Sequence, residues 1–429
     1  DGIQNYEPSD FFGGIKAFKD LSSFFNIKNQ IDKHFIKNYM DQKSTADIVI
    51  IGGGVIGCST AYNLANQGAK NVVLLEKGDI CSGGTAKSCA ITRSHYTIEA
   101  NMHHAVESIK IFENFDQIIG GDPNFQRSGY IILGSEEIRT KMETVFQMQN
   151  KYGIDTQTLT PAEAKEYHPL LQYGDVDVIG YESRTGYCDP YLTTTSYAKR
   201  AKDLGVQFFT ETLVTGIQRK GNIKTVQTQK GSFETENIIM IAGSWTKNLG
   251  RMIGVDFPFS ITKHKVLTLK IDMPYQKDWP IVKDLISPEN IYFRPDSGGV
   301  VLVGTGDFGD EIENMELMTD EVEIEHIESI GRSMSNRMPS FGDAQLVTSW
   351  TGPYDIPPDW NPIIGPVPGH EGFYAAFGFS GHGFKMAPTI GESMAQQVLG
   401  VEPRVPIEMY SMTRFTTGNT LNGTYGIGT

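Results

Sequence analysis

Residues 47–57 read Asp-Ile-Val-Ile-Ile-Gly-Gly-Gly-Val-Ile-Gly, and this stretch decides the fold. Its first five residues form a largely apolar run, which is typical of a strand buried on both faces of a parallel sheet. The glycines follow at once and open an expected helix over Gly54–Gly68, and a second buried strand is expected over Asn71–Glu76. The spacing therefore predicts a strand, a helix and a second, parallel strand in succession.

The glycine loop fits the pattern GxGxxG at the position where a dinucleotide needs it. Gly52 permits a tight turn, Gly54 lets a pyrophosphate approach the backbone, and Gly57 allows close contact between helix and strand. The N-terminus of the helix favours the negative charge. Glu76 ends the second strand, where a carboxylate accepts hydrogen bonds from ribose hydroxyls and disfavours a 2′-phosphate. The pattern predicts FAD or NAD; a merely tight turn is the alternative.

Composition places this chain of 429 residues among globular proteins, and its length leaves room for one large two-layered unit or two interleaved domains. The net charge of −14 argues against a nucleic-acid partner. No apolar stretch approaches the ~18 residues of a membrane-spanning helix. Four cysteines without a CxxC pair are too few for a disulfide framework, so we expect reduced thiols. With no secretory signal visible, we expect a cytoplasmic protein, and the mitochondrial matrix stays open as an alternative.

Residues 1–46 precede the first strand and are expected to form a helical extension. Phe18, Leu21 and Phe25 begin an apolar stripe at nearly helical spacing. The stripe either packs on the body of the same chain or docks on a partner subunit, a second copy or a membrane surface. Further strands are expected over Tyr130–Leu133, Lys265–Ile271 and Gly299–Gly304, and further helices over Glu136–Lys151, Pro190–Leu204, Asp320–Arg337 and Phe384–Leu399.

Three later segments resemble a known family. The segment Ser82–Arg93 resembles the second flavin-contacting loop of the D-amino-acid-oxidase-type FAD superfamily, and Ile238–Trp245 resembles its strand beside the cofactor. The segment Trp350–Leu399 is the most specific, because it contains Pro-Ile-Ile-Gly-Pro-Val-Pro-Gly at 362–369 and Gly-Phe-Ser-Gly-His-Gly-Phe-Lys at 378–385. It resembles the sarcosine oxidase (beta-subunit-like) and dimethylglycine dehydrogenase branch. The resemblance covers about residues 46–415.

This resemblance implies an α/β fold with a Rossmann-type, glutathione-reductase-like FAD-binding domain. It also implies an interleaved α+β substrate domain built on a mostly antiparallel sheet. The FAD-binding domain is expected to be discontinuous, over residues 47–125, 181–260 and 345–429, and the substrate domain to comprise residues 126–180 and 261–344. The expected cofactor contacts are Gly52, Gly54, Val55, Ile56, Gly57, Glu76, Lys77, Ser82, Thr85, Ala86, Lys87, Ser88, Cys89, Ala90, Ile91, Val214, Ala242, Gly243, Trp245, Gly381, His382, Gly383, Phe384 and Lys385.

The resemblance also implies the reaction, in which a hydride equivalent passes from the carbon next to an amine nitrogen to flavin N5. By motif match, Arg93 and Lys385 are expected to bind a substrate carboxylate. His382 stands among backbone amides that would stabilise the reduced flavin, although it could also be a spacer between glycines. Tyr292, His264 and Tyr354 are weaker candidates for lining the pocket. We find no metal-binding pattern and no dedicated acid or base.

The relatives that tether FAD do so through a cysteine near 350–359 or a histidine at the position that matches Lys87. This chain has neither residue there, so the FAD is expected to be non-covalent. The expected substrate is a small secondary or tertiary amino acid such as sarcosine, dimethylglycine or proline. A primary amino acid such as glycine, and an FAD-bearing assembly or electron-transfer subunit, stay open as alternatives. The electron acceptor is also left open.

Overall fold

The computed structural model describes residues 43–272, 275–306 and 309–423. Most of the predicted N-terminal extension, residues 1–42, lies outside the described residues. Within the described part of the chain, no helix combines the length and apolarity needed to cross a bilayer. All four cysteines are buried and carry free thiols, as the expectation of reduced thiols requires.

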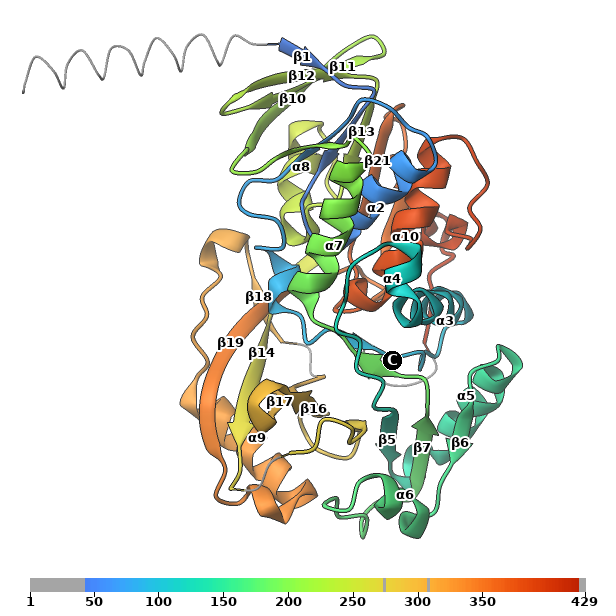
Figure 1. Ribbon diagram of the computed structural model, residues 1–429, viewed down its shortest axis with the longest axis vertical. Coiled ribbons are helices and arrows are strands. Elements are labelled where there is room, and N and C mark those ends of the chain that lie inside the picture. Colours follow the sequence, from blue (N-terminus) through green and yellow to red (C-terminus); the bar gives the residue numbers. More distant parts are fainter. Residues whose placement is uncertain (1–42, 273–274, 307–308, 424–429) are drawn as a thin grey trace, which may run out of the picture.

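The predicted glycine-loop unit lies in a six-stranded sheet in the upper half of Figure 1. Its strands are β2 (Ile48–Ile51), β3 (Val72–Leu75), β9 (Gln207–Phe209), β13 (Asn237–Met240), β20 (Ile363–Pro366) and β21 (Phe373–Phe377). They lie in the order β20-β21-β13-β2-β3-β9, and only the pair β20 and β21 is antiparallel. β2 and β3 are central and buried on both faces, which explains their unbroken apolar sequences.

Helices cover one face of this sheet and a smaller sheet lies against the other. The helices of the first face and its flank are α2 (Val55–Asn66), α3 (Glu99–Glu113), α4 (Phe115–Ile118), α7 (Pro190–Asp203) and α10 (Gly383–Val398). On the second face lie α8 (Thr246–Met252) and a four-stranded sheet of β1 (Lys43–Thr45), β10 (Val214–Lys220), β11 (Ile223–Thr228) and β12 (Gly231–Thr235). Both faces are therefore closed to water, as a parallel sheet requires.

A nine-stranded, mostly antiparallel sheet forms the lower half of Figure 1. Its strands are β5 (Tyr130–Gly134), β6 (Thr156–Thr158), β7 (Val178–Glu182), β14 (Ser260–Lys270), β15 (Ile281–Asp284), β16 (Tyr292–Asp296), β17 (Val300–Gly304), β18 (Asp310–Ile312) and β19 (Gln345–Ile356). The helices α5 (Arg139–Lys151), α6 (Pro161–Tyr167) and α9 (Ile324–Arg337) belong to the same region. The predicted fold class is confirmed. The last strand of this sheet extends to Ile356. The sequence, by contrast, predicts that the substrate domain ends at residue 344.

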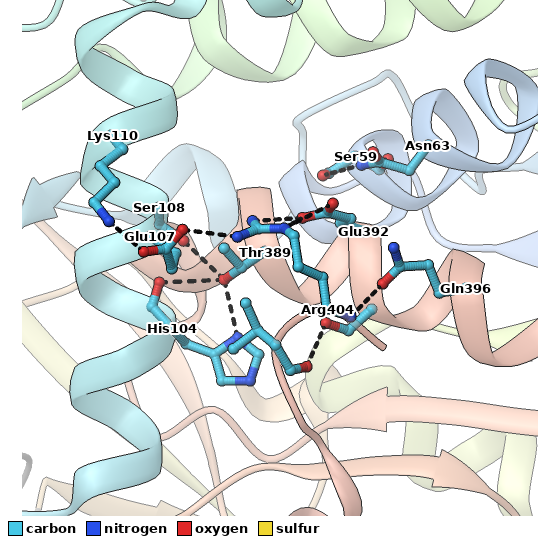
Figure 2. Close-up of polar contacts among 12 residues, drawn as sticks. Ser59, Asn63, His104, Glu107, Ser108, Lys110, Thr389, Glu392, Gln396 and Arg404 are labelled. Carbon is cyan, nitrogen blue, oxygen red and sulfur yellow. Dashed lines mark hydrogen bonds and ion pairs between the residues drawn. The ribbon is translucent and has the colours of Figure 1, made fainter. Parts of the chain in front are cut away.

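A polar cluster ties α3 to α10 (Figure 2). Thr389 Oγ1 lies 3.0 Å from His104 Nδ1 and 2.9 Å from Ser108 Oγ. Burial lowers the pKa of His104 to about 3, so the ring stays neutral at physiological pH. Nearer the surface, Arg404 Nη2 donates to Glu392 Oε2 over 2.8 Å. The cluster holds α10 in place, and the first residues of α10 line the cavity described below.

A buried ion pair anchors the C-terminal segment, and its loss is expected to destabilise the fold. Arg414 donates two hydrogen bonds to Asp359, of 2.7 and 2.8 Å, and the two side chains are 3% and 2% exposed. Asp359→Asn is expected to cost about 3–5 kcal/mol in the free energy of unfolding, because it leaves the arginine charge buried and uncompensated. Equilibrium unfolding in urea measures this. Asp203→Asn, which breaks an exposed pair with Lys199, should cost less than about 1 kcal/mol. Equal costs would contradict the assignment.

Candidate active site

A cavity of about 770 Å³ lies where the two large sheets meet, and it contains most of the predicted site residues. Its walls come from the ends of β2 and β3, the segment after β3, the segment after β13, the faces of β14 and β16, and the start of α10. This volume is at the upper end of the range for small-molecule sites, about 300–1,000 Å³. It suits a ligand as large as a dinucleotide together with a small substrate.

The glycine loop is built so that only glycine fits at its ends. The backbone of Gly52 has φ +123°, and a Cβ built there would lie 2.1 Å from the carbonyl oxygen of Ile241. A Cβ at Gly57 would lie 2.0 Å from the carbonyl oxygen of Gly52. α2 begins directly after Gly54, and its first amide, that of Val55, donates to Thr85 Oγ1 over 3.2 Å. The helix N-terminus therefore faces the cavity across the loop, where it favours an anion.

Glu76 lies beside the glycine loop and also lines the cavity. Its Oε2 accepts a hydrogen bond of 2.7 Å from the amide of Gly53, and its Oε1 accepts one of 2.8 Å from the amide of Gly78. Both contacts fix the carboxylate at the end of β3. A carboxylate held there fits the ribose-binding role expected from the sequence.

The predicted second flavin loop, residues 82–93, crosses from the glycine loop to the nine-stranded sheet. It contains a short 3-10 helix, η2 (Gly84–Lys87), and a short strand, β4 (Ile91–Thr92). Trp350 Nε1 of β19 donates to the carbonyl oxygen of Lys87 over 3.2 Å, so the loop is bonded to the nine-stranded sheet. The Lys87 ammonium also forms an ion pair of 2.7 Å with Asp320. The loop therefore joins the two sheets along one wall of the cavity.

The block after β21 forms the opposite wall. Asp355, at the end of β19, accepts a hydrogen bond of 2.6 Å from the amide of Gly378 and is buried. Burial raises the pKa of Asp355 to about 6. The following turn has positive φ at Gly378, Ser380 and Gly381, and His382 is the N-terminal cap of α10. This carboxylate therefore holds the turn that brings the start of α10 to the cavity.

Arg93 and Lys385 lie together in this cavity, and both are more than 90% buried. The Arg93 guanidinium lies 4.4 Å from the ring centre of Tyr96, and its Nη1 donates to the carbonyl oxygen of His95. Lys385 Nζ donates to the carbonyl oxygen of Gly381 over 3.3 Å. Burial and the positive charge of Arg93 lower the pKa of Lys385 well below the ordinary lysine value. A neighbouring arginine and lysine of this kind can bind an anion.

A buried polar network lies directly behind Arg93. His95 Nδ1 lies 3.2 Å from Glu182 Oε1, and Gln149 Nε2 lies within 3.2 Å of both atoms. Burial acts to raise the pKa of Glu182, but hydrogen bonds from His95 and Ser94 outweigh it and the pKa is lowered. The network fixes the main chain of residues 93–95 and, through the carbonyl oxygen of His95, the direction of the Arg93 side chain.

Aromatic side chains complete the wall formed by the nine-stranded sheet. The Tyr292 hydroxyl lies 3.3 Å from Cys89 Sγ, and burial raises the pKa of Tyr292 well above its ordinary value. His264 and Tyr354 stack with ring centres 3.7 Å apart. The Tyr354 ring also packs against Gly381, where a Cβ would lie 2.4 Å from the ring. The three weaker sequence candidates therefore line the same cavity.

The family model described as DAO, FAD dependent oxidoreductase, matches residues 47–397. The chain belongs to this family. Human mitochondrial dimethylglycine dehydrogenase is 28% identical over 84% of this chain, and the match covers 43% of that protein. The sarcosine oxidase beta subunit of Arthrobacter is 27% identical over 89% of this chain and 94% of its own length. The structure of L-proline dehydrogenase from P. horikoshii superposes with a TM-score of 0.82 and 28% identity, over 89% of this chain and all of that one.

The chain thus spans less than half the length of the dimethylglycine dehydrogenase that it matches. FAD is the cofactor of this chain, and it is held without a covalent bond. The cavity fits it, because the glycine loop and the N-terminus of α2 line the cavity and the Glu76 carboxylate stands at its edge. Among the described residues, no group of His, Cys, Asp and Glu is arranged to hold a metal ion.

The structure gathers nearly all of the predicted site residues around this cavity. Ser82 and Ala86 are the exceptions, because neither lines it. The Ser82 hydroxyl instead lies beside Gly78, because a Cβ built on Gly78 would be 2.8 Å from Ser82 Oγ. Sequence reasoning missed Lys283 and Asp355. A lysine inside the apolar strand Ile281–Asp284 was the available signal for the first of them.

Proposed function

We propose that this FAD-dependent oxidoreductase oxidises a small secondary or tertiary amino acid, of the sarcosine, dimethylglycine or proline type, at the carbon next to its nitrogen. The observation that supports this most is the pair of buried cations, Arg93 and Lys385, in the cavity that also contains the glycine loop. The pair suits a carboxylate. The names of the relatives, which are dehydrogenases and oxidases of such amino acids, support the same substrate class.

In this proposal the protein supplies binding, orientation and a fixed electrostatic field. Bound FAD supplies the redox chemistry by accepting a hydride equivalent. Arg93 and Lys385 bind the substrate carboxylate and so fix which carbon faces the cofactor. Tyr292 and Tyr354 close the cavity around the amine. The amides at the start of α10, near His382, offer a positive field for the charge that develops on reduction.

The binding of a carboxylate is expected to weaken as the pH rises. Lys385 is charged only below its pKa, and burial with the nearby charge of Arg93 lowers that pKa well below the ordinary value. When the pH rises above this lowered pKa, Lys385 loses its proton and the site keeps only the charge of Arg93. The Kd for the carboxylate therefore increases. Titration of the flavin absorbance with acetate, which has no amine to titrate, measures this. The Lys385→Met variant should bind acetate more weakly than the wild-type protein at low pH. Its Kd for acetate should not rise further as the pH increases. An unchanged pH profile in this variant would contradict the role.

The experiment that tests the proposed function is a substrate comparison with two readouts. Sarcosine, dimethylglycine, proline and glycine are compared with their decarboxylated counterparts, such as dimethylamine and pyrrolidine. Dye reduction and oxygen consumption are both followed, so that either acceptor is detected. The proposal expects turnover of N-methylated or cyclic amino acids and little turnover of the decarboxylated amines. Faster turnover of glycine would favour a primary amino acid oxidase, and turnover of none would favour an assembly or electron-transfer subunit.

A further inference from the structure

The carboxyl group of Asp355 is buried at the cavity and has no part in the function proposed above. Asp355 is 8% exposed and lines the cavity. Its carboxylate accepts hydrogen bonds from the main-chain amides of Gly378, over 2.6 Å, and of Phe379. Its carbonyl oxygen accepts one of 3.1 Å from the amide of Ser380. Three bonds therefore join Asp355 to the turn before α10, and Phe379 and Ser380 line the cavity as well.

These partners are neutral, and the register neighbour of Asp355 on β14 is the apolar Ile261. Within the described residues, no lysine, arginine or histidine forms an ion pair with this carboxylate, and none shifts its pKa. The titratable and charged groups on the elements packed against it are Lys87 of η2, Lys263 and His264 of β14, Tyr354 of β19, and His382 and Lys385 at the start of α10. The charge of Asp355 is therefore stabilised by amides alone.

Two opposed effects leave Asp355 close to its point of titration. Burial disfavours the charged form, while the amides of Gly378 and Phe379 favour it, and the pKa is raised to about 6. The carboxyl group is then charged at neutral pH, but a modest added field is enough to protonate it. A hydride equivalent adds one negative charge to bound FAD. A unit charge about 10 Å away, at the effective dielectric constant of a protein, changes a protonation equilibrium about 10-fold.

We propose that Asp355 is the proton acceptor linked to reduction of the bound FAD. Its carboxylate is charged while the cofactor is oxidised, and it takes up one proton when the cofactor accepts a hydride equivalent. In amine oxidation the substrate ammonium loses one proton from nitrogen and a hydride equivalent from carbon as the C=N bond forms. The hydride equivalent passes to FAD and the proton to Asp355. The added negative charge on the cofactor is thereby offset by the loss of the charge on Asp355.

The test uses the FAD-loaded protein without any amine, so its outcome does not depend on the proposed substrate class. The flavin is reduced anaerobically in equilibrium with a redox dye of known potential, from about pH 5 to about pH 8. The equilibrium constant for reduction should fall about 10-fold further over this range in the wild-type protein than in Asp355→Asn, because only the aspartate adds a proton. The asparagine keeps an acceptor for the amide of Gly378, and FAD content after purification checks that the turn is retained.

The matched control is Glu316→Gln, which removes an exposed carboxylate from the same cavity. It should keep the wild-type pH dependence, because solvent screens its charge. Equal pH dependence in the wild-type protein and Asp355→Asn would overturn the proposal, as would loss of the extra dependence in Lys385→Met but not in Asp355→Asn.

A second measurement needs no stable variant. Infrared difference spectra of the wild-type protein, reduced minus oxidised, should show a new band from a protonated carboxyl group near neutral pH. The band should be absent below the pKa of about 6, where Asp355 is already protonated in the oxidised protein. Reduction without a new carboxyl band would contradict the assignment even if Asp355→Asn holds no FAD.

Discussion

A Gly57→Ala variant is expected to lose most of its bound FAD. The new Cβ would lie 2.0 Å from the carbonyl oxygen of Gly52, which is a backbone atom on the turn that the pyrophosphate approaches. Overpacking destabilises a protein by about 1–3 kcal/mol where neighbouring side chains can move aside. Here the two atoms in contact are a Cβ and a backbone oxygen, so no side-chain movement can relieve the contact. Relief of the contact must separate α2 from β2 and open the glycine loop. The ratio of flavin absorbance to protein absorbance after purification measures the loss.

Gly331→Ala is the matched control for that substitution. Gly331 lies within α9, and a Cβ there meets nothing within 4 Å. The alanine should therefore keep the FAD content and raise stability slightly, by up to about 1 kcal/mol. Far-ultraviolet circular dichroism distinguishes a Gly57→Ala protein that is folded but empty from one that is unfolded. A Gly57→Ala protein with full FAD content would contradict the described loop geometry.

Arg93→Ala is expected to weaken the binding of every carboxylate substrate while the FAD remains bound. The guanidinium lies beside Lys385 and is directed by the carbonyl oxygen of His95. A hydrogen bond to a charged partner contributes about 1.5–3 kcal/mol, so the apparent Kd should rise about 10- to 150-fold. Spectral titration with acetate and anaerobic reduction by sarcosine measure the change.

The control for this prediction is Arg127→Ala, because Arg127 has an exposed side chain and does not line the cavity. It should leave both the FAD content and the Kd for acetate unchanged. Arg93→Lys keeps the charge but loses the planar fork and should fall between the wild-type protein and Arg93→Ala. An unchanged Kd for every carboxylate in Arg93→Ala would exclude this arginine from the substrate site.

The sequence could predict the parts of the fold in which local pattern and tertiary contact agree. The apolar runs at 48–51 and 72–75 belong to the parallel sheet, and the glycine spacing at 52–57 predicts the loop that the structure contains. The start of α10 at Gly383 follows from the block at 378–385. These features depend on residues that are close together in the sequence, so the local sequence pattern is enough to predict them.

The remaining site residues depend on contacts between distant segments. Lys283 lies in the cavity because β15 pairs with β5 and β16, and no local pattern gives the order of strands in the nine-stranded sheet. The Glu182 network behind Arg93 joins residues nearly 90 positions apart. Asp355 accepts a hydrogen bond from the amide of Gly378, which lies 23 residues later in the sequence. In each case the position of the residue depends on contacts between distant segments, and composition and spacing do not give strand order or register.

The most direct test of the central claim is an anaerobic absorbance spectrum of the purified protein, recorded before and after the addition of sarcosine, dimethylglycine, proline and glycine in turn, followed by acid precipitation. The account predicts a flavin band that an N-methylated or cyclic amino acid bleaches, and yellow colour in the supernatant after precipitation. A protein that takes up no FAD, a flavin band that no amine bleaches, or flavin retained in the precipitate would contradict it.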